Sequence, residues 1–484
     1  MQMTVLMAFA LVLVLGTSRD PLLIHAPGPL LLTAVAAYWV VSAGLSATVS
    51  AVSLRRLRSN TVSMTAASRV YQRLSLLVQA WLLMGLVGLI GLGIMDQLAS
   101  SWPLARVGPV RDGRVQVIQE LLVLAVFLVA LVLHWLTAYR FEHALRMQVE
   151  QELILAGRPV RPGWTLRQFL DFHFRHQFLF VALPVVLIML SRDLVALLNV
   201  PPRWEWIKSF ATAAAVGVVF IASPALLVHV WRTRPMADGE LRRRIERLCA
   251  TLNLRYRQLR IWDTAGVIAN AGVMGLHRHL RYVLVTDALL ENMDDAQIVA
   301  VFGHEAGHIK HHHLGYFLVF TLAAMALSLA AVSAVMTLLP ATTSPRQVEL
   351  VQMGISLGTI VLIWGVGFGW LSRRFERQAD VYGAWCAGLD VAGGGGENPL
   401  AAGAPTFVTA LENVGLLNGM SRTARNWRHG SIASRVAFLK NWTVAGYSRF
   451  AFDQSIARIK AILWLVLLAG GIVAALTYRI WLTT

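Results

Sequence analysis

The sequence predicts a mainly α-helical, polytopic membrane protein with about nine transmembrane helices. Hydrophobic residues make up 56% of the chain and charged residues 14%, and the mean hydropathy is +0.59, whereas about 25% of an ordinary soluble domain is charged. Apolar runs of about twenty residues, long enough to cross a hydrocarbon core of about 30 Å, recur along the chain. The basic residues are concentrated in alternate loops between these runs.

The expected membrane helices follow one another along the chain. Long apolar windows lie at 29–51, 74–95, 118–139, 207–231, 316–339, 350–371 and 461–482. A weaker window at 177–199 contains Arg192 and Asp193, so this helix either ends near Leu190 or carries a charged pair at its edge. A second weak window, 2–16, lacks a basic n-region and an evident cleavage site, which favours a retained first helix over a signal peptide.

The distribution of basic residues predicts the orientation in the membrane. The net charge is +17, and arginines are concentrated at 55–73, 140–175 and 232–281. By the positive-inside rule these loops are expected in the cytoplasm. Because the basic stretches alternate with the membrane windows, membrane orientation is favoured as the cause of the net charge and nucleic acid is not an expected partner. Because the chain is rich in Arg and poor in Lys, we expect a GC-rich bacterial genome and a multi-pass protein of the inner membrane.

This orientation gives a domain organisation in which two non-membrane segments meet on the cytoplasmic face. The expected parts are an N-terminal bundle of about six helices at 1–231, a first cytoplasmic segment at 232–315, a transmembrane hairpin at 316–371, a second cytoplasmic segment at 372–460 and a last helix at 461–484.

The segment His304-Glu305-Ala306-Gly307-His308 predicts a metal site. On an α-helix, residues i and i+4 lie on one face, so His304 and His308 can bind one zinc ion through their imidazoles. Glu305 is then placed to act as a general base on a water molecule at the metal.

A third ligand is needed, because catalytic zinc sites usually have three protein ligands and a water. Glu376 and Asp380 follow the returning helix of the predicted hairpin and are also related as i and i+4. We expect Glu376 to complete a site for one zinc ion per chain. Asp380 is expected to accept a hydrogen bond from a ligand imidazole and so fix its tautomer.

Several stretches, together with these motifs, carry a resemblance to a known family. They are Asp238–Arg242, Asn270-Ala271 with Gly275 behind it, Val283–Leu290, the HEAGH segment followed by His311 to His313, Ser372–Asp380, and His429–Arg435. On these residues the sequence resembles the integral-membrane gluzincin metalloproteases, the family of type I CAAX prenyl proteases and HtpX-like proteases. Residues before 238 match only as a set of membrane helices.

The resemblance implies a cytoplasmic zincin-type protease domain that includes a small β-sheet. It implies that His429 and Arg435 lie near the scissile bond and that Asn270 lies beside an edge strand to which an extended substrate peptide pairs. The sequence departs from the family pattern at Gly430, where Pro is usual, and at Gln297, where Glu is usual. The substitution at Gln297 is expected to affect local capping. The expected helices also exceed those of the better-known members.

The function expected from these features is that of a zinc metalloendopeptidase that hydrolyses membrane-associated or misfolded proteins. Processing of lipidated C-termini, as by CAAX proteases, is the alternative; a bacterial source disfavours it, because prenylated substrates are not expected there. A non-catalytic scaffold or transporter that retains a zinc site is a further alternative. The partners are therefore peptide or protein substrates and the lipid bilayer. The sequence gives no oligomeric state.

Three other features receive structural interpretations. His311, His312 and His313 are expected at the membrane boundary rather than in a second metal site. Cys249 and Cys386 lack zinc-ligand spacing and are expected to be free thiols. The glycine run at 393–396 is expected to be a flexible loop, with a plain linker favoured over a lid that covers the site.

Overall fold

The structure is a computed structural model that describes residues 2–15, 26–59, 64–101, 116–155, 157, 164–198, 200–275, 277–340, 344–391, 398–424 and 426–483. The predicted fold class is confirmed, since the described chain is mainly helical and has one small sheet. The chain divides into two compact units. The first comprises Met1–Arg234, Arg260–Gly266 and Met274–Tyr282, and the second Pro235–Leu259, Val267–Val273 and Val283–Thr484.

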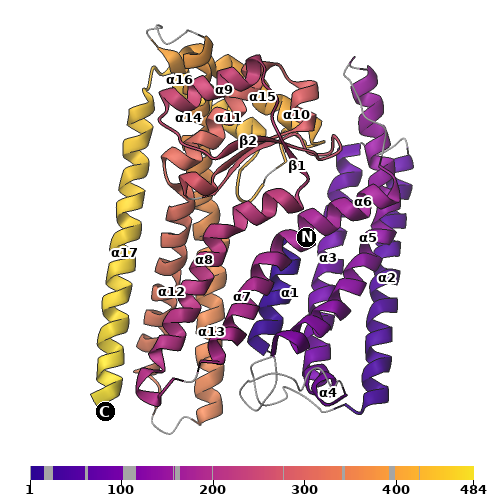
Figure 1. Ribbon diagram of the computed structural model, residues 1–484, viewed down its shortest axis with the longest axis vertical. Coiled ribbons are helices and arrows are strands. Elements are labelled where there is room, and N and C mark those ends of the chain that lie inside the picture. The colour runs from indigo at the N-terminus through magenta and orange to yellow at the C-terminus, as the bar shows by residue number, and fades with distance from the viewer. Residues whose placement is uncertain are drawn as a thin grey trace. The chain divides into compact units, whose positions relative to one another are not determined.

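The first unit is a bundle of helices (Figure 1). They are α1 (Gln2–Leu15), α2 (Gly28–Arg58), α3 (Met64–Gly91), α4 (Ile94–Ser101), α5 (Gln116–Leu155), α6 (Leu166–His173), α7 (Phe180–Ala196) and α8 (Trp206–Val230). The π-helical segment η2 (Phe174–Leu179) connects α6 and α7, and two short 3-10 turns, η3 (Pro202–Trp204) and η4 (Arg278–Leu280), complete the unit.

Small polar residues form the contact face of α2, which packs against α3 and α5. Its buried positions include serines spaced three or four residues apart, namely Ser42, Ser46, Ser50 and Ser53. Ser46 Oγ lies 2.6 Å from His134 Nδ1 and accepts a hydrogen bond of 2.6 Å from Thr137 Oγ1, both on α5. Helices in membranes associate in this way, through small residues and interhelical hydrogen bonds, because lipid-facing hydrophobic residues gain little by burial.

The second unit holds the other helices. They are α9 (Glu240–Thr251), α10 (Asp287–Asn292), α11 (Asp295–Lys310), α12 (His313–Met336), α13 (Pro345–Leu362), α14 (Gly369–Val391), α15 (Pro399–Leu417), α16 (Ile432–Val444) and α17 (Arg449–Thr483). The π-helical segment η5 (Ile363–Phe368) joins α13 directly to α14. α17 packs along α12, as Figure 1 shows.

The sheet has four short strands in the order β1-β2-β4-β3. The strands are β1 (Thr233–Pro235), β2 (Gln258–Trp262), β3 (Ala271–Met274) and β4 (Tyr282–Thr286). Every residue of β4 is buried, as expected of an inner strand, whereas β3 is at the edge of the sheet. The small sheet implied by the family resemblance is therefore present.

Eight helices within the described residues are long and apolar enough to cross a membrane, so the chain is a multi-pass membrane protein. All but one of them coincide with a predicted window. The remaining one, 399–417, belongs to α15, whose apolar side packs against α14: a Cβ on Gly403 would lie 2.0 Å from the carbonyl oxygen of Ala384. The expected windows 2–16 and 350–371 are helical, but neither is among the candidate spans.

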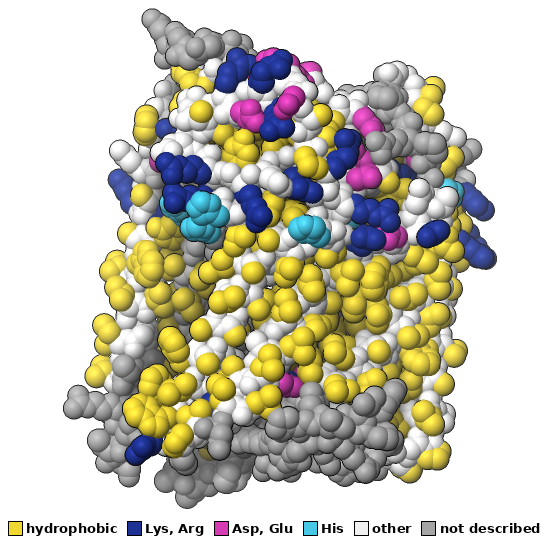
Figure 2. Space-filling view, in the orientation of Figure 1, with side chains coloured by type: hydrophobic (Ala, Val, Ile, Leu, Met, Phe, Trp, Pro, Cys, Tyr) yellow, Lys and Arg dark blue, Asp and Glu magenta, His cyan; other side chains and the backbone are white. Residues whose placement is uncertain are grey.

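The exposed surface of the long helices is hydrophobic. On the face drawn in Figure 2, hydrophobic side chains cover most of their visible surface. Large apolar residues are exposed along several of them, for example Leu32 on α2, Met84 on α3, Phe210 on α8 and Met325 on α12. Such a surface is unfavourable in water and favourable in lipid, which agrees with the membrane assignment.

A charged cluster joins the ends of α5 and α7. Arg192 donates two hydrogen bonds, of 2.8 and 2.9 Å, to the two carboxylate oxygens of Glu120, whose side chain is 2% exposed. Arg192 also binds Asp193, and the Asp193 carboxylate accepts a hydrogen bond from the backbone N–H of Val117. α7 therefore continues past Leu190 and carries the charged pair at its edge, because Glu120 compensates the buried part of the guanidinium.

Removing the guanidinium should destabilise the bundle. We expect Arg192→Met to lower the stability by about 3–5 kcal/mol, since it leaves the Glu120 carboxylate buried and unpaired. Thermal unfolding in detergent measures this effect. The matched control is Arg203→Met, an exposed arginine in η3. The double variant Arg192→Met/Glu120→Leu should recover part of the loss, and equal unfolding temperatures for Arg192→Met and the wild type would contradict the assignment.

Candidate metal centre

Glycines allow α11 and α14 to approach each other closely. A Cβ on Gly303 would lie 2.6 Å from Cβ of Cys386, and one on Gly307 would lie 3.1 Å from Cβ of Tyr382. On the opposite helix, a Cβ on Gly383 would lie 3.0 Å from the backbone nitrogen of His304. Because no side chains separate the two backbones here, short side chains on α14 can reach the imidazoles of α11.

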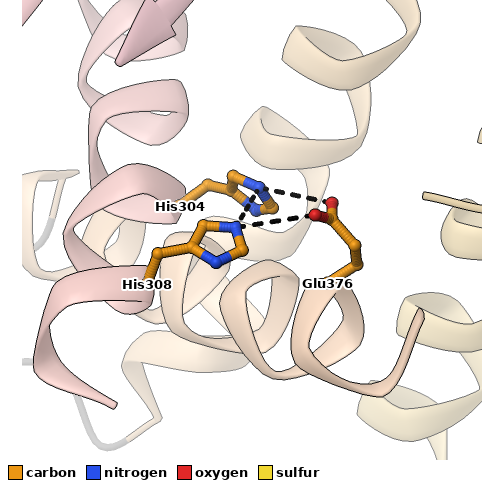
Figure 3. Close-up of side chains that lie close together, drawn as sticks. All are labelled: His304, His308 and Glu376. Carbon is orange, nitrogen blue, oxygen red and sulfur yellow. Dashed lines mark hydrogen bonds and ion pairs between the residues drawn. The ribbon is translucent and has the colours of Figure 1, made fainter. Parts of the chain in front are cut away.

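The side chains of His304, His308 and Glu376 converge across this contact (Figure 3). The Nε2 atoms of the two histidines lie 3.2 Å apart. Each lies 3.7 Å from one carboxylate oxygen of Glu376. A tetrahedral metal with bonds of about 2.05 Å requires its ligand atoms to lie about 3.3 Å apart, so this donor set fits a zinc-sized ion. The described residues contain one such cluster.

A second pair of charges lies behind the ligands. Asp380 on α14 is fully buried, and its Oδ1 lies 3.0 Å from Nδ1 of His304. Arg435 on α16 donates to both carboxylate oxygens of Asp380, with Nε 2.9 Å from Oδ2. Its Nη2 also lies 3.6 Å from Oε2 of Glu376. The guanidinium thus compensates two buried carboxylates.

The electrostatic environment keeps two carboxyl groups of the site, those of Glu376 and Glu305, in different states. For Glu376, burial raises the pKa, but the hydrogen bond from His429 and the charge of Arg435 outweigh it, so the pKa lies well below its ordinary value. Glu305 is half-buried and has no such partner, and its burial raises the pKa from 4.5 to about 7. Glu376 is therefore ionised, as a metal ligand would have to be, and Glu305 can accept a proton near neutral pH.

A tight loop presents His429 to Glu376. Nδ1 of His429 lies 2.8 Å from Oε1 of Glu376, while its side chain remains 45% exposed. Asn426 and Gly430 pair through two backbone hydrogen bonds, and the Asn426 carboxamide accepts from the N–H of His429. Gly430 has φ of +75°, and its N–H donates to Asn426. A proline could supply neither feature, which explains the departure from the family pattern at this position.

The same loop is attached to the π-helical segment before α14. Trp427 donates a hydrogen bond of 2.8 Å from Nε1 to the carbonyl oxygen of Gly365 in η5. Arg373 in turn donates to the carbonyl oxygen of Trp427. The loop that carries His429 is therefore fixed to the helix that carries Glu376.

The structure brings together six of the eight predicted site residues, namely His304, His308, Glu376, Asp380, His429 and Arg435, and Glu305 follows His304 on the same helix. Asn270 lies next to the edge strand β3, with its backbone bound to Thr286 and its side chain exposed. No hydrogen bond or ion pair joins it to the cluster within the described part of the chain.

Other expectations have mixed outcomes. Gln297 lies at the capped start of α11: its backbone N–H donates to the N-cap residue Asp294, and its side chain accepts a hydrogen bond from Asn413 on α15. The expected effect of the substitution on capping stays a prediction. Cys249 and Cys386 are free thiols, as predicted. The glycine run 393–396 lies outside the described residues. Sequence reasoning assigned no role at the site to His313, Gln378 or Asp453, although they form a hydrogen-bonded chain that reaches His308.

Comparisons with known proteins agree with the family resemblance. Residues 235–393 match the model of Peptidase family M48. A CAAX prenyl protease 1 homolog of Arabidopsis thaliana is 27% identical over 177 residues, which are 34% of this chain and 41% of that protein. Protease HtpX of Xylella fastidiosa is 27% identical over 170 residues, 32% of this chain and 51% of that protein. The chain thus matches about half or less of the length of these relatives.

The fold was also compared with solved structures. The crystal structure of S. mikatae Ste24p aligns with a TM-score of 0.48 and 14% sequence identity, covering 84% of this chain and 98% of that one.

The raised pKa of Glu305 predicts a pH-dependent stability of the metal-free protein. A carboxyl whose pKa rises from 4.5 to about 7 on folding contributes stability that is complete below pH 4.5 and is lost as the pH rises through 7. We therefore expect metal-free Glu305→Gln to unfold at about the wild-type temperature at pH 5 and at a higher temperature at pH 8. Differential scanning fluorimetry with chelator measures both. The exposed Glu291→Gln is the control, and a gap that does not change with pH would refute the expectation.

Proposed function

We propose that this chain, whose residues 235–393 match Peptidase family M48, is a membrane-embedded zinc-dependent endopeptidase. The observation that carries the proposal is the convergence of His304, His308 and Glu376 beside Glu305. Two imidazoles and one carboxylate are the donor set of a catalytic zinc site with one position left for water or substrate. When bound, zinc supplies Lewis acidity that polarises a carbonyl group and makes water nucleophilic near neutral pH.

The protein's own residues then divide the remaining tasks. Glu305 accepts the proton of the attacking water and delivers it to the leaving amine nitrogen, for which a pKa near 7 is suitable. Asp380 holds the ring of His304 with Nε2 toward His308 and Glu376, where the three side chains would hold the zinc ion. Peptide hydrolysis needs a general base and a metal position that is open to water or substrate. A module that only binds a metal needs neither.

His429 and Arg435 have different roles in this proposal. Nδ1 of His429 donates to Glu376; in the imidazolium form, in which both ring nitrogens carry a hydrogen, Nε2 of this half-exposed ring can donate to a substrate carbonyl oxygen as it becomes negative. Arg435 is 13% exposed and its fork is occupied by Asp380, so it positions the carboxylates rather than gripping the substrate. Asn270 beside the edge strand β3 is a proposed contact for an extended peptide that pairs with this strand.

The substrates are proposed to be membrane-associated or misfolded proteins, cut on the cytoplasmic face. The sequence motif and donor set lie in a multi-pass membrane protein, and the arginine-rich loops favour the cytoplasmic side of a bacterial inner membrane. We retain the proposed organisation of a membrane bundle at 1–231, a hairpin at 316–371 and a two-part protease domain at 232–315 and 372–460, followed by a last helix at 461–484.

Processing of lipidated C-termini is the second candidate, favoured by the similarity to a CAAX prenyl protease 1 homolog. Substrates that remain bound to the Glu305→Gln variant distinguish the two. Recovery of prenylated C-terminal peptides would favour the processing protease, and recovery of internal segments of membrane proteins the quality-control protease. An intact donor set with a poised base disfavours a non-catalytic scaffold or transporter.

Glu305→Gln should abolish proteolysis without removing the metal. The amide cannot accept the water proton, so we expect casein cleavage by the full-length protein in detergent to fall at least about 100-fold. The zinc content should stay at the wild-type value, because no ligand is altered. Glu291→Gln is the isosteric control on α10 and should retain activity. Cleavage by Glu305→Gln or by chelator-treated protein at the wild-type rate would rule out the mechanism.

The ligand assignment has its own test. His304→Ala and Glu376→Gln should each lower the zinc content of the purified protein far below one ion per chain, because two remaining ligands bind zinc weakly. His279→Ala, which alters an exposed histidine outside the cluster, should retain a full complement. Elemental analysis after dialysis against a weak chelator measures all three. A wild-type content in His304→Ala would remove this histidine from the ligand set.

A further inference from the structure

The ligand His308 makes a second contact, on the side of its ring that faces away from the metal site. Its Nδ1 lies 2.8 Å from Nδ1 of His313, the first residue of α12. His312 adopts a left-handed conformation, φ +55°, which reverses the chain between α11 and α12. His313 is 1% exposed and its ring stacks on Phe375 with 4.2 Å between centroids. Packing against Phe375 therefore fixes the His313 ring in its contact with His308.

The opposite nitrogen of His313 continues the chain of contacts. Its Nε2 lies 3.0 Å from Oε1 of Gln378 on α14. The NH2 group of Gln378 donates a hydrogen bond of 2.7 Å to Asp453 on α17, and lies 3.1 Å from Nδ1 of His311. An ionised carboxylate only accepts hydrogen bonds, so Asp453 requires the NH2 group of Gln378 on its side. The orientation of this amide is thereby determined.

The direction of each hydrogen bond follows from this orientation. Because Oε1 of Gln378 accepts, Nε2 of His313 carries a hydrogen. The two Nδ1 atoms of His308 and His313 lie 2.8 Å apart and share one hydrogen; with the hydrogen of the His313 ring on Nε2, its Nδ1 is the acceptor. His308 must then carry its hydrogen on Nδ1. Its Nε2, which faces Glu376 at 3.7 Å, is left with the lone pair that a metal needs.

We propose that Asp453, Gln378 and His313 are positioning residues that fix the metal-binding tautomer of His308. The inference rests on the proposed zinc site and deepens it. His304 is oriented by a single carboxylate, Asp380, on α14, whereas His308 is oriented through a relay of three side chains. The relay starts at Asp453 on α17, a helix that begins at Arg449, ahead of the last membrane helix expected at 461–484. α17 is therefore part of the support of the metal centre.

Lys460 on α17 makes a contact next to the relay that does not belong to it. Its Nζ donates a hydrogen bond of 2.6 Å to the carbonyl oxygen of His311. Removing this ammonium weakens the attachment of α17 to the turn after α11 without changing the direction of any hydrogen bond in the relay. Lys460→Met is therefore the control for attachment of α17 alone.

The test is the affinity of full-length protein in detergent for zinc, measured by competition with a chromophoric chelator. In Asp453→Asn the new amide can donate to Gln378, which lets the Gln378 amide turn over and reverses the relay. We expect the affinity for zinc to fall about 10- to 100-fold. Lys460→Met and Gln454→Glu, which alters an exposed neighbour on α17, should bind zinc as the wild type does. A loss in Lys460→Met as large as that in Asp453→Asn would overturn the relay.

Two further measurements separate tautomer control from a general loss of structure. In a Gln378→Met background the relay is already interrupted, so adding Asp453→Asn should cause no further loss of zinc affinity; additive losses would contradict the proposal. With cobalt in place of zinc, the visible absorption spectrum of Asp453→Asn should approach that of His308→Ala. A wild-type spectrum at saturating cobalt would likewise contradict it.

The same series separates failure of the relay from failure of the zinc site. If His308→Ala binds zinc as tightly as the wild type, the proposed metal site is wrong. If His308→Ala loses zinc and Asp453→Asn does not, the metal site stands and the relay is wrong.

Discussion

The candidate centre depends on the close approach of α11 and α14. Gly303 and Gly307 on one helix and Gly383 on the other leave no Cβ between the backbones. A carboxylate on a short side chain, Glu376, can therefore lie opposite two imidazoles that are one turn apart, at distances suited to a single ion. Gly307 lies inside the HEAGH segment, so the residues between the ligands matter as much for helix packing as the ligands do for chemistry.

This arrangement buries several charged side chains close together, and ion pairs between them offset the cost of burying each charge. Asp380 and Glu376 share the guanidinium of Arg435, and Glu376 also receives His429. Within the described residues, no hydrogen bond or ion pair of this kind joins Glu305, so burial makes its ionised form unfavourable and raises its pKa to about 7. A buried carboxyl group with a raised pKa contributes little to the stability of the fold at neutral pH, but it can exchange protons there. Such groups are often found at functional sites.

Sequence reasoning found what local spacing encodes. The i and i+4 relations of His304 with His308 and of Glu376 with Asp380 predict shared helix faces, and hydropathy predicts most of the membrane helices. The sequence does not predict the relay from Asp453 through Gln378 to His313. Asp453 and Gln378 are 75 positions apart, Gln378 and His313 are 65 apart, and the three follow no repeating pattern. The apolar helix α15 shows the opposite limit. Its composition resembles that of a membrane span, but its glycine and alanine residues serve tight packing against α14.

In the π-helical segment η5, the number of residues matters more for the structure than which residues they are. It lies between α13 and α14, the helix that carries Glu376, and the carbonyl oxygen of Gly365 within it anchors the loop of His429. Each residue of an α-helix turns the chain by about 100°. Deleting one residue from 363–368 would therefore rotate α13 by more than a quarter turn relative to α14. It would also move the carbonyl oxygen of Gly365 away from Trp427, whose hydrogen bond holds the loop. Exchanges of side chains here can be absorbed by repacking, whereas insertions and deletions cannot.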